Sequence, residues 1–315
     1  MAGRTHCEEK VENGLTLFDE IMARFGQMSI PARANEPMSA HTTFRIGGPA
    51  RVFCTPNSQA QLAQAIAACR ELGLRYYLLG RGSNVLFADE GYEGVVVQVG
   101  SRLGDIQVDG RRVTAGAGAL LAHVCLAAAE AGLAGLEFAY GIPGCVGGGV
   151  YMNAGAYGGE IKDVLEHVTF FDDQLREVTL SAADLHLGYR TSAFELMPWC
   201  ILRASFLLEP GSADEIRERM RDFAQRRVDK QPLDMPSAGS TFKRPKGAYA
   251  GALIDKCGLR GYAVGGAAIS QKHCGFVVNK GGATCADVIC LTDTVAKIVK
   301  EQTGYTLERE IRVVR

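Results

Sequence analysis

Residues 141–158 read GIPGCVGGGVYMNAGAYG, and seven of them are glycine. Glycine loses more conformational entropy on folding than any other residue, so this density in an apolar stretch needs a physical reason. A backbone that must pass flush against a large flat ligand, and bond to its edge atoms and phosphates, supplies that reason. We therefore expect a binding segment here, with a purely structural glycine-rich loop as the alternative.

A second motif lies upstream, directly after the apolar run 76–79. It consists of Leu79, Gly80, Arg81, Gly82, Ser83 and Asn84. Two glycines around an arginine, followed by Ser and Asn, can form a nest of backbone N–H groups that binds an anion; a tight surface turn is the alternative. Two candidate binding loops before residue 160 indicate one extended, dinucleotide-like cofactor.

A third glycine-containing stretch, Gly116-Ala-Gly118, resembles the start of a dinucleotide fingerprint after a strand. Leu121 stands where the third glycine is needed for close helix–strand packing, so we expect a plain turn into a helix. No Walker A sequence is present, which argues against a P-loop nucleotidase.

The composition is that of an ordinary globular protein, with 47% hydrophobic residues, 22% charged residues and a formal net charge of −1. This balance argues against a general nucleic-acid binder. Residues 1–10 lack the apolar core of a signal peptide, and no uncharged apolar run is long enough to span a membrane. The ten cysteines and six histidines do not cluster at metal-ligand spacing. We expect a soluble, cytoplasmic protein without a metal and with small-molecule partners, no nucleic acid and no membrane; a monomer is favoured.

Hydrophobic periodicity and capping residues predict the order of secondary structure. Helices are expected at 11–29, 58–73, 120–131, 212–229, 247–257 and 284–300. Strands are expected at 50–56, 75–79, 94–99, 106–108, 112–115, 166–172, 175–180, 200–208, 275–279 and 310–314. We divide the chain into an N-terminal helix (1–30), a domain over 31–209 that splits near 105, and a C-terminal domain over 210–315.

Seven motifs, in order over residues 37–314, resemble the UDP-N-acetylenolpyruvoylglucosamine reductases. They are TFRIGG (43–48), LGRGSN (79–84), GIPG (141–144), NAGAYG (153–158), YRTS (189–192), AGSTFK (238–243) and LEREIR (307–312). The resemblance implies an α+β chain with a vanillyl-alcohol-oxidase-type FAD-binding fold of two subdomains and a C-terminal α+β substrate-binding domain. It also implies that NADPH reduces FAD, which then reduces enolpyruvyl-UDP-GlcNAc to UDP-N-acetylmuramate.

The resemblance implies three catalytic residues. Arg190 would grip the substrate carboxylate, onto which negative charge spreads, and a planar guanidinium can do so bidentately. Ser240 would protonate the resulting enolate, and Glu310 would polarise the developing enol. Glu308 lies two residues away, but in the family pattern the glutamate immediately precedes Ile-Arg, which favours Glu310.

The resemblance also assigns binding residues. The cofactor set is Leu79, Gly80, Arg81, Gly82, Ser83, Asn84, Gly141, Ile142, Pro143, Gly144, Cys145, Gly147, Gly148, Asn153, Gly155 and Ala156. The substrate set is Lys230, Arg244, His273 and Tyr157. Arg244 replaces an asparagine of many members, and His273 stands where some have glutamine. A lid loop with a tyrosine is missing after 190–200, as in the shorter subclass of the family.

Two other functions remain open from the sequence. One is a different FAD-linked oxidoreductase of the same fold, in which His41 or Cys145 could tether the flavin covalently. The other is a non-catalytic nucleotide-sugar-binding module, which would be colourless when purified.

Overall fold

A computed structural model describes residues 16–315 of the chain, so the first residues of the helix predicted at 11–29 lie outside the described part. The chain forms two compact units. Of the described residues, the first unit contains 16–36, Ala50–Gly80 and Glu93–Ala224; the second contains Pro37–Pro49, Arg81–Tyr92 and Gln225–Arg315. The sequential domain boundaries given above stay a prediction.

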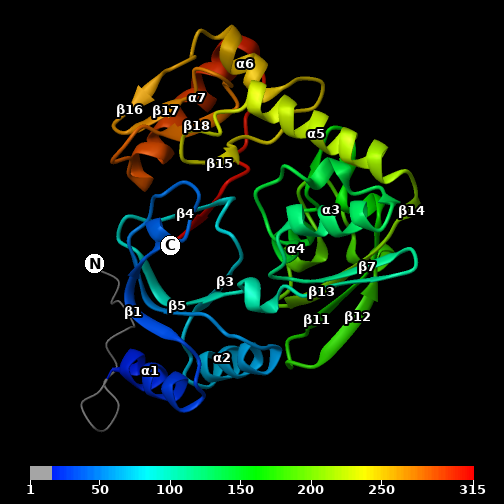
Figure 1. Cartoon of the computed structure of the whole chain (residues 1–315). Helices are drawn as coiled ribbons and strands as arrows, with labels where there is room; N and C mark the ends of the chain where they lie inside the picture. The colour runs from blue at the N-terminus through cyan, green and yellow to red at the C-terminus, as the bar shows by residue number, and fades with distance from the viewer. Residues whose placement is uncertain (1–15) are drawn as a thin grey trace. The chain divides into compact units, whose positions relative to one another are not determined.

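The first sheet of the first unit has the strand order β1-β2-β5-β3. Its strands are β1 (Ala32–Pro37), β2 (Pro49–Cys54), β5 (Tyr92–Gln98) and β3 (Tyr76–Leu79), and β3 runs parallel to β5. Helices α1 (Leu17–Gln27) and α2 (Gln59–Glu71) lie side by side against it (Figure 1). Ser58 caps α2 by accepting a hydrogen bond from the Gln61 N–H, as its position predicts. The strand–helix–strand unit predicted over 50–79 is confirmed.

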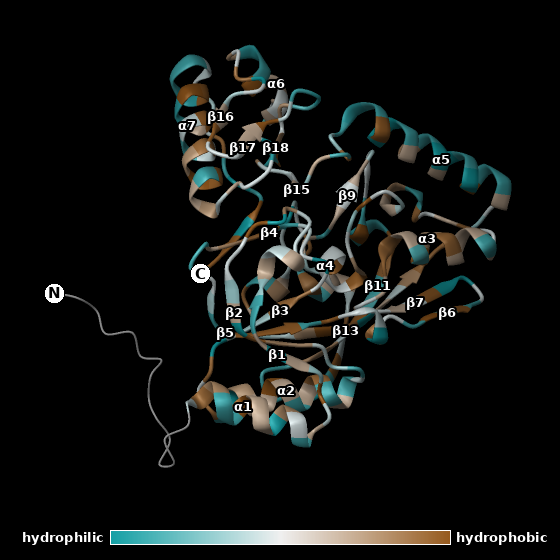
Figure 2. Ribbon diagram, turned by 60° about the vertical axis from the view of Figure 1, so that its left-hand side comes forward, coloured by the Kyte–Doolittle hydropathy of each residue, from teal (hydrophilic) through white to brown (hydrophobic). Residues whose placement is uncertain are grey.

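The second sheet of the first unit is antiparallel, in the order β12-β11-β13-β7-β6. Its strands are β6 (Ile106–Asp109), β7 (Arg112–Gly116), β11 (Leu165–Phe171), β12 (Glu177–Ser181) and β13 (Cys200–Leu207). Apolar side chains of β7, β11 and β13 form the core with α3 (Leu121–Glu130) and α4 (Val146–Tyr151), as the brown ribbon of Figure 2 illustrates. Gly110, with φ of +56°, makes the two-residue turn of the predicted β6–β7 hairpin.

The second unit has an antiparallel sheet in the order β15-β18-β17-β16. Its strands are β15 (Ser237–Ser240), β18 (Phe276–Asn279), β17 (Ala267–Ile269) and β16 (Ala263–Val264), and helices α6 (Ala250–Lys256) and α7 (Cys285–Thr303) share its core. A separate parallel pair joins β4 (Val85–Phe87) to β19 (Arg312–Val314). Residues 81–92 are therefore packed with the C-terminal end of the chain, far away in sequence.

The remaining elements are short, apart from one long charged helix. Helix α5 (Ala213–Lys230) buries Ile216 and Met220 in the core of the first unit. The helix therefore has an apolar side that packs on the protein as well as the charged side that faces solvent. The short strands are β8 (Leu133–Ala134), β9 (Gly155–Ala156), β10 (Gly159–Glu160) and β14 (Glu209–Pro210). Single 3₁₀ turns occur at Met38–Ala40, Ser101–Leu103, Glu137–Ala139, Ile161–Asp163, Ala182–Leu185 and Ala193–Glu195. Among residues 16–315, no helix is long and apolar enough to cross a membrane.

Candidate active site

The glycine-rich segment folds as a turn over 141–144, the short helix α4 and the β9–β10 hairpin. Part of its glycine content serves packing. A Cβ on Gly147 would lie 3.1 Å from the Cβ of Ala117, and one on Gly149 would lie 3.3 Å from the Leu121 side chain. By contrast, a Cβ on Gly148 would meet no atom of a non-neighbouring residue closer than 3.8 Å. The structural reading of the glycines therefore explains some positions and leaves others open to a ligand.

The two loops predicted to bind one cofactor meet within the first unit. Leu79 ends β3 and is buried, and the chain continues into Gly80. A Cβ on Gly80 would lie 2.5 Å from the Sγ atom of Cys145, the N-cap residue of α4. Only glycine fits there, so residue 80 is fixed by its contact with the segment 141–158. Two separate sequence motifs are thus in contact within this unit.

The rest of the upstream loop belongs to the second unit. A Cβ on Gly82 would lie 2.1 Å from the carbonyl oxygen of His41, and Gly82 accepts a hydrogen bond from the Thr43 N–H at 3.1 Å. Asn84 accepts from the Arg312 N–H at 3.0 Å, and its Nδ2 donates to the carbonyl of Glu310 at 3.4 Å. Within the second unit, residues 81–84, predicted to bind an anion, are therefore hydrogen-bonded to the segment that contains Glu310, the predicted catalytic glutamate.

Ser240 ends β15 and is exposed. Strand β15 pairs with β18 at Ser237↔Val278 and at Ser240↔Phe276. Between these two pairs β15 advances by three residues and β18 by two, so β15 contains a β-bulge. This bulge contains Gly239, whose φ of +77° favours glycine. Bulges re-aim the side chains beside them. The backbone at Gly239 thus sets the direction of the Ser240 hydroxyl.

Glu310 lies beside this strand. Its N–H donates to the carbonyl of Thr241 at 2.8 Å, and Phe242 pairs with Arg309 in an antiparallel bridge. Glu310 is half-buried. The side chain of Glu308 is 71% exposed and pairs with Lys243 at 3.5 Å. In the second unit, Ser240 and Glu310 therefore lie on adjacent backbone segments that are hydrogen-bonded to each other. Glu308 instead forms an ion pair with Lys243 at the surface.

Arg190 occupies the tip of a two-residue turn in the first unit. Gly188 and Thr191 pair at its base through backbone hydrogen bonds of 3.1 and 3.3 Å. Arg190 has a left-handed backbone with φ of +57°, and its guanidinium donates to the Gly155 carbonyl at 3.3 Å. It also lies over the Tyr189 ring, 5.0 Å from the centroid. A non-glycine residue in this conformation is a strained position that the surroundings must hold.

Asn153 is fully buried and sits below that turn. Its Nδ2 donates to Glu160 Oε2 and to the Gly188 carbonyl, both at 2.9 Å, and its Oδ1 accepts from the Lys162 N–H at 2.9 Å. The Asn153 side chain is thus bonded to the protein itself. The predicted contact of Asn153 with the cofactor stays a prediction. The sequence analysis did not predict its hydrogen bond to the Gly188 carbonyl.

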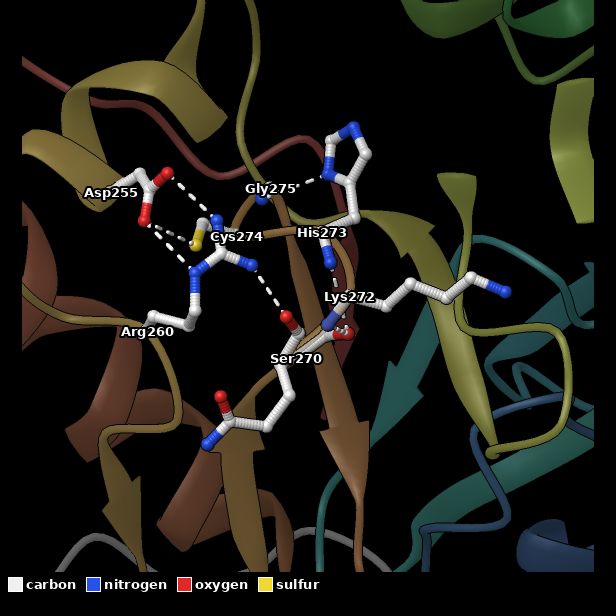
Figure 3. Close-up of polar contacts among 8 residues, drawn as sticks. Asp255, Arg260, Ser270, Lys272, His273, Cys274 and Gly275 are labelled. Atoms are coloured by element: carbon white, nitrogen blue, oxygen red, sulfur yellow. Dashed lines mark hydrogen bonds and ion pairs between the residues drawn. The ribbon is translucent and has the colours of Figure 1, made fainter. Parts of the chain in front are cut away.

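His273 lies in a loop before β18 that is held by polar contacts of Asp255, Arg260 and Ser270 (Figure 3). Its Nδ1 accepts from the Gly275 N–H at 3.0 Å, which leaves the proton of the neutral ring on Nε2. Burial lowers the pKa of His273 below its usual 6.5; a hydrogen bond to its own backbone opposes this to a smaller degree, and the positive charge of Arg260 adds to the lowering. The ring therefore favours its neutral form and can donate a hydrogen bond through Nε2.

Arg260 fixes the start of the same loop. Its guanidinium forms two hydrogen bonds with Asp255, at 3.0 and 2.7 Å, and a third with the carbonyl of Gln271 (Figure 3). The Cys274 thiol donates to Asp255 at 3.5 Å. This pairing of Asp255 with Arg260 could not be predicted from sequence patterns, because it depends on the geometry of the chain after the end of α6.

The other predicted substrate residues are spread over both units. Lys230 is exposed at the end of α5 and Arg244 lies 4.5 Å over the Tyr249 ring. Tyr157, at the tip of the β9–β10 hairpin with φ of +53°, stacks on Phe223 with ring centroids 4.7 Å apart. None of the predicted catalytic or substrate residues lines the 410 Å³ cavity of the second unit beside Ser270–Lys272.

No group of three or more His, Cys, Asp or Glu side chains suited to a metal ion occurs among residues 16–315. Matches to known families cover most of the chain. Residues 50–181 match the model of the FAD binding domain, and residues 231–314 match that of the UDP-N-acetylenolpyruvoylglucosamine reductase C-terminal domain.

Individual relatives agree with these matches. The UDP-N-acetylenolpyruvoylglucosamine reductase of Caldanaerobacter subterraneus subsp. tengcongensis is 47% identical over 89% of this chain and 92% of its own. That of Clostridium botulinum (strain Eklund 17B / Type B) is 46% identical over the same shares. The crystal structure of UDP-N-acetylenolpyruvylglucosamine reductase from Thermus caldophilus superposes with a TM-score of 0.76 and 35% identity, over 91% of this chain and 99% of the other.

These likenesses confirm the predicted fold class, an α+β chain with an FAD-binding fold of the vanillyl-alcohol-oxidase type and a C-terminal α+β domain. They also confirm the resemblance first seen in the seven motifs. The chain belongs to the UDP-N-acetylenolpyruvoylglucosamine reductase family and is an oxidoreductase of that family.

Proposed function

We propose that this protein uses NADPH, through a bound FAD, to reduce the enolpyruvyl ether of enolpyruvyl-UDP-GlcNAc to UDP-N-acetylmuramate, a step of peptidoglycan precursor synthesis. The observation that carries the proposal is the adjacency of Ser240 and Glu310, joined by the Glu310–Thr241 backbone hydrogen bond beside the bulge at Gly239. The names of the relatives support the same reaction. We propose the cytoplasm as the compartment, because both expected substrates are nucleotides.

The residues of the first unit fit a flavin. Gly80 approaches the Cys145 side chain too closely to carry a side chain of its own, so the two glycine-containing loops lie against each other. Gly80, Cys145, Gly148 and the turn at 141–144 would hold the cofactor through backbone groups. Bound FAD would supply the hydride that is added to the substrate.

The side chains of this chain perform the remaining chemistry. Arg190 holds the substrate carboxylate and stabilises the negative charge that spreads onto it, an effect worth roughly 10²–10³-fold in rate. Ser240 donates the proton to the substrate carbon, because the enolate is a stronger base than the serine alkoxide that the transfer leaves. Glu310 polarises the developing enol. Lys230 binds the diphosphate, and His273 donates from Nε2 to the substrate.

The proposal is tested by measuring NADPH oxidation by the purified yellow holoenzyme with and without enolpyruvyl-UDP-GlcNAc. The expected result is slow oxidation without the acceptor and stoichiometric formation of UDP-N-acetylmuramate with it. A colourless protein with normal folding would favour the nucleotide-sugar-binding module. Flavin that stays on the protein after acid precipitation would favour a tethered oxidase, with Cys145 or His41 as the attachment point.

A further inference from the structure

Asn153 joins three segments that are separate in sequence. It has no exposed surface, and its amide bonds link Glu160 of β10, the Lys162 N–H and the Gly188 carbonyl. Both Nδ2 hydrogens are donated to oxygen atoms of the protein. A side chain with these bonds cannot turn toward a ligand without breaking all three of them, which is costly because the Asn153 amide is fully buried.

Gly188 is the base of the turn that carries Arg190. Two backbone hydrogen bonds close this turn, and side chains anchor it at either end. On one side Asn153 donates to the Gly188 carbonyl; on the other the buried Ser192 hydroxyl donates to the Tyr151 carbonyl at 2.8 Å. Because Arg190 itself holds a left-handed backbone, these anchors must offset its local strain.

Glu160 places a negative charge beneath the same turn. A hydrogen bond from Lys162 is the largest effect that lowers the pKa of Glu160; burial opposes it, and the Asn153 amide and the charges of Lys162 and Arg190 add to the lowering. Glu160 is therefore ionised at neutral pH and attracts the Arg190 guanidinium. The same carboxylate fixes the orientation of the Asn153 amide, because only the NH₂ side can face it.

We infer that Asn153 is a positioning residue for Arg190, which holds the Gly188–Thr191 turn so that the guanidinium is presented in one geometry to a carboxylate of the substrate. This inference rests on the role of Arg190 in the proposed function. It differs from the reading of Asn153 as a cofactor contact, since it predicts no effect on the flavin. It also adds a residue outside the motif YRTS to the recognition of the carboxylate.

The test uses Asn153→Asp in the FAD-loaded protein, because aspartate keeps the shape and replaces the two donors with an acceptor. We expect flavin content, the flavin absorbance spectrum and the rate of reduction by NADPH to stay within twofold of the parent. Reoxidation of the reduced flavin at low enolpyruvyl-UDP-GlcNAc should slow by about 10-fold to 100-fold, with most of the loss in apparent affinity. If this variant gives no folded holoenzyme, Asn153→Ser takes its place, because it removes the amide without adding a second negative charge beside Glu160.

The matched control is Asn279→Asp in the second unit. Asn279 is also buried, donates from Nδ2 to the Phe44 carbonyl and accepts the Gly281 and Ala283 N–H groups, but it does not touch the Arg190 turn. We expect the control to lower thermal stability to a similar degree while leaving the ratio of the two half-reaction rates unchanged. Asn153→Asp must therefore change the balance of the half-reactions, beyond any loss of stability.

A double-variant cycle with Arg190→Met shows whether Asn153 acts through Arg190. In the Arg190→Met background, Asn153→Asp should change reoxidation less than twofold. The inference is overturned by a full effect in that background, or by an equal fall in both half-reactions with weaker flavin binding. Arg190→Met alone addresses the proposed function: if it leaves reoxidation unchanged, Arg190 has no role in the reaction, and that failure is seen before Asn153 is considered.

Discussion

The Arg190 turn and the Ser240–Glu310 strand pair hold their functional side chains by different means. Arg190 depends on side chains, since the amide of Asn153 and the hydroxyl of Ser192 anchor its turn. Ser240 and Glu310 depend on backbone hydrogen bonds, with a bulge at Gly239 setting the direction of the serine. The first region should therefore be sensitive to polar side-chain substitutions, and the second to substitutions that change backbone conformation.

The largest effect is expected from Ser240→Ala, which removes the proposed proton donor and leaves every backbone hydrogen bond in place. Substrate-driven reoxidation of the flavin should slow by about 10²–10⁴-fold, the usual contribution of a general acid. Reduction by NADPH should be nearly unaffected, and stopped-flow absorbance of the flavin follows both steps. Equal losses in the two steps would mean that Ser240 supports the flavin and that the backbone of the second region positions something else.

The next effect separates the two glutamates of the last motif. Glu310→Gln should slow reoxidation by roughly 10²-fold, because a polarising carboxyl group is lost from the site. Glu308→Gln, the matched control, should have little effect, since that side chain is 71% exposed and its pairing with Lys243 is a surface ion pair. A larger loss at Glu308 in the same assay would reverse the assignment.

Gly239→Ala examines the backbone control of Ser240 directly. No atom of a non-neighbouring residue lies within 4 Å of the new Cβ, so the effect comes from φ of +77°, which costs a non-glycine residue about 1–2 kcal/mol. We expect reoxidation to slow by about tenfold as the bulge shifts to relieve the strain. Gly258→Ala is the control, with φ of +70° and equally open surroundings at the end of α6. It should lower the unfolding free energy similarly without changing either half-reaction.

The sequence predicted the longer helices and strands, but not short strands such as β4 and β15, nor how the candidate site residues are held. Periodicity and caps suffice for local structure such as α2, which begins after Ser58 as expected. The pairing of Val85–Phe87 with Arg312–Val314 joins segments more than 200 residues apart, and periodicity contains no information about such partners. The bulge at Gly239 and the bonds of Asn153 are likewise tertiary features, because each depends on a strand or turn from elsewhere in the chain.

A smaller effect is expected in the first region from Ser192→Ala. Its hydroxyl is buried and donates to the Tyr151 carbonyl, so removal costs about 1–3 kcal/mol and loosens one end of the Arg190 turn. The KM for the enolpyruvyl substrate should rise severalfold with little change in the maximal rate. Ser205→Ala, which removes a buried hydroxyl paired with Thr114 at 2.8 Å, is the control. An equal rise of KM in both variants would indicate a general loss of stability.

The smallest effect concerns His273, whose loop precedes β18, the strand paired with β15. Burial lowers the pKa of His273 in the folded protein below 6.5, so between that lowered pKa and 6.5 the unfolded chain binds more protons than the folded one. Its contribution to stability is therefore complete above pH 6.5 and is lost as the pH falls below it. His273→Gln removes this titration, so the variant should lose roughly 1–2 °C less in Tm than the parent between pH 7.5 and 5.5. Identical pH dependence of the two proteins would mean that burial does not lower the pKa of His273 in the folded protein.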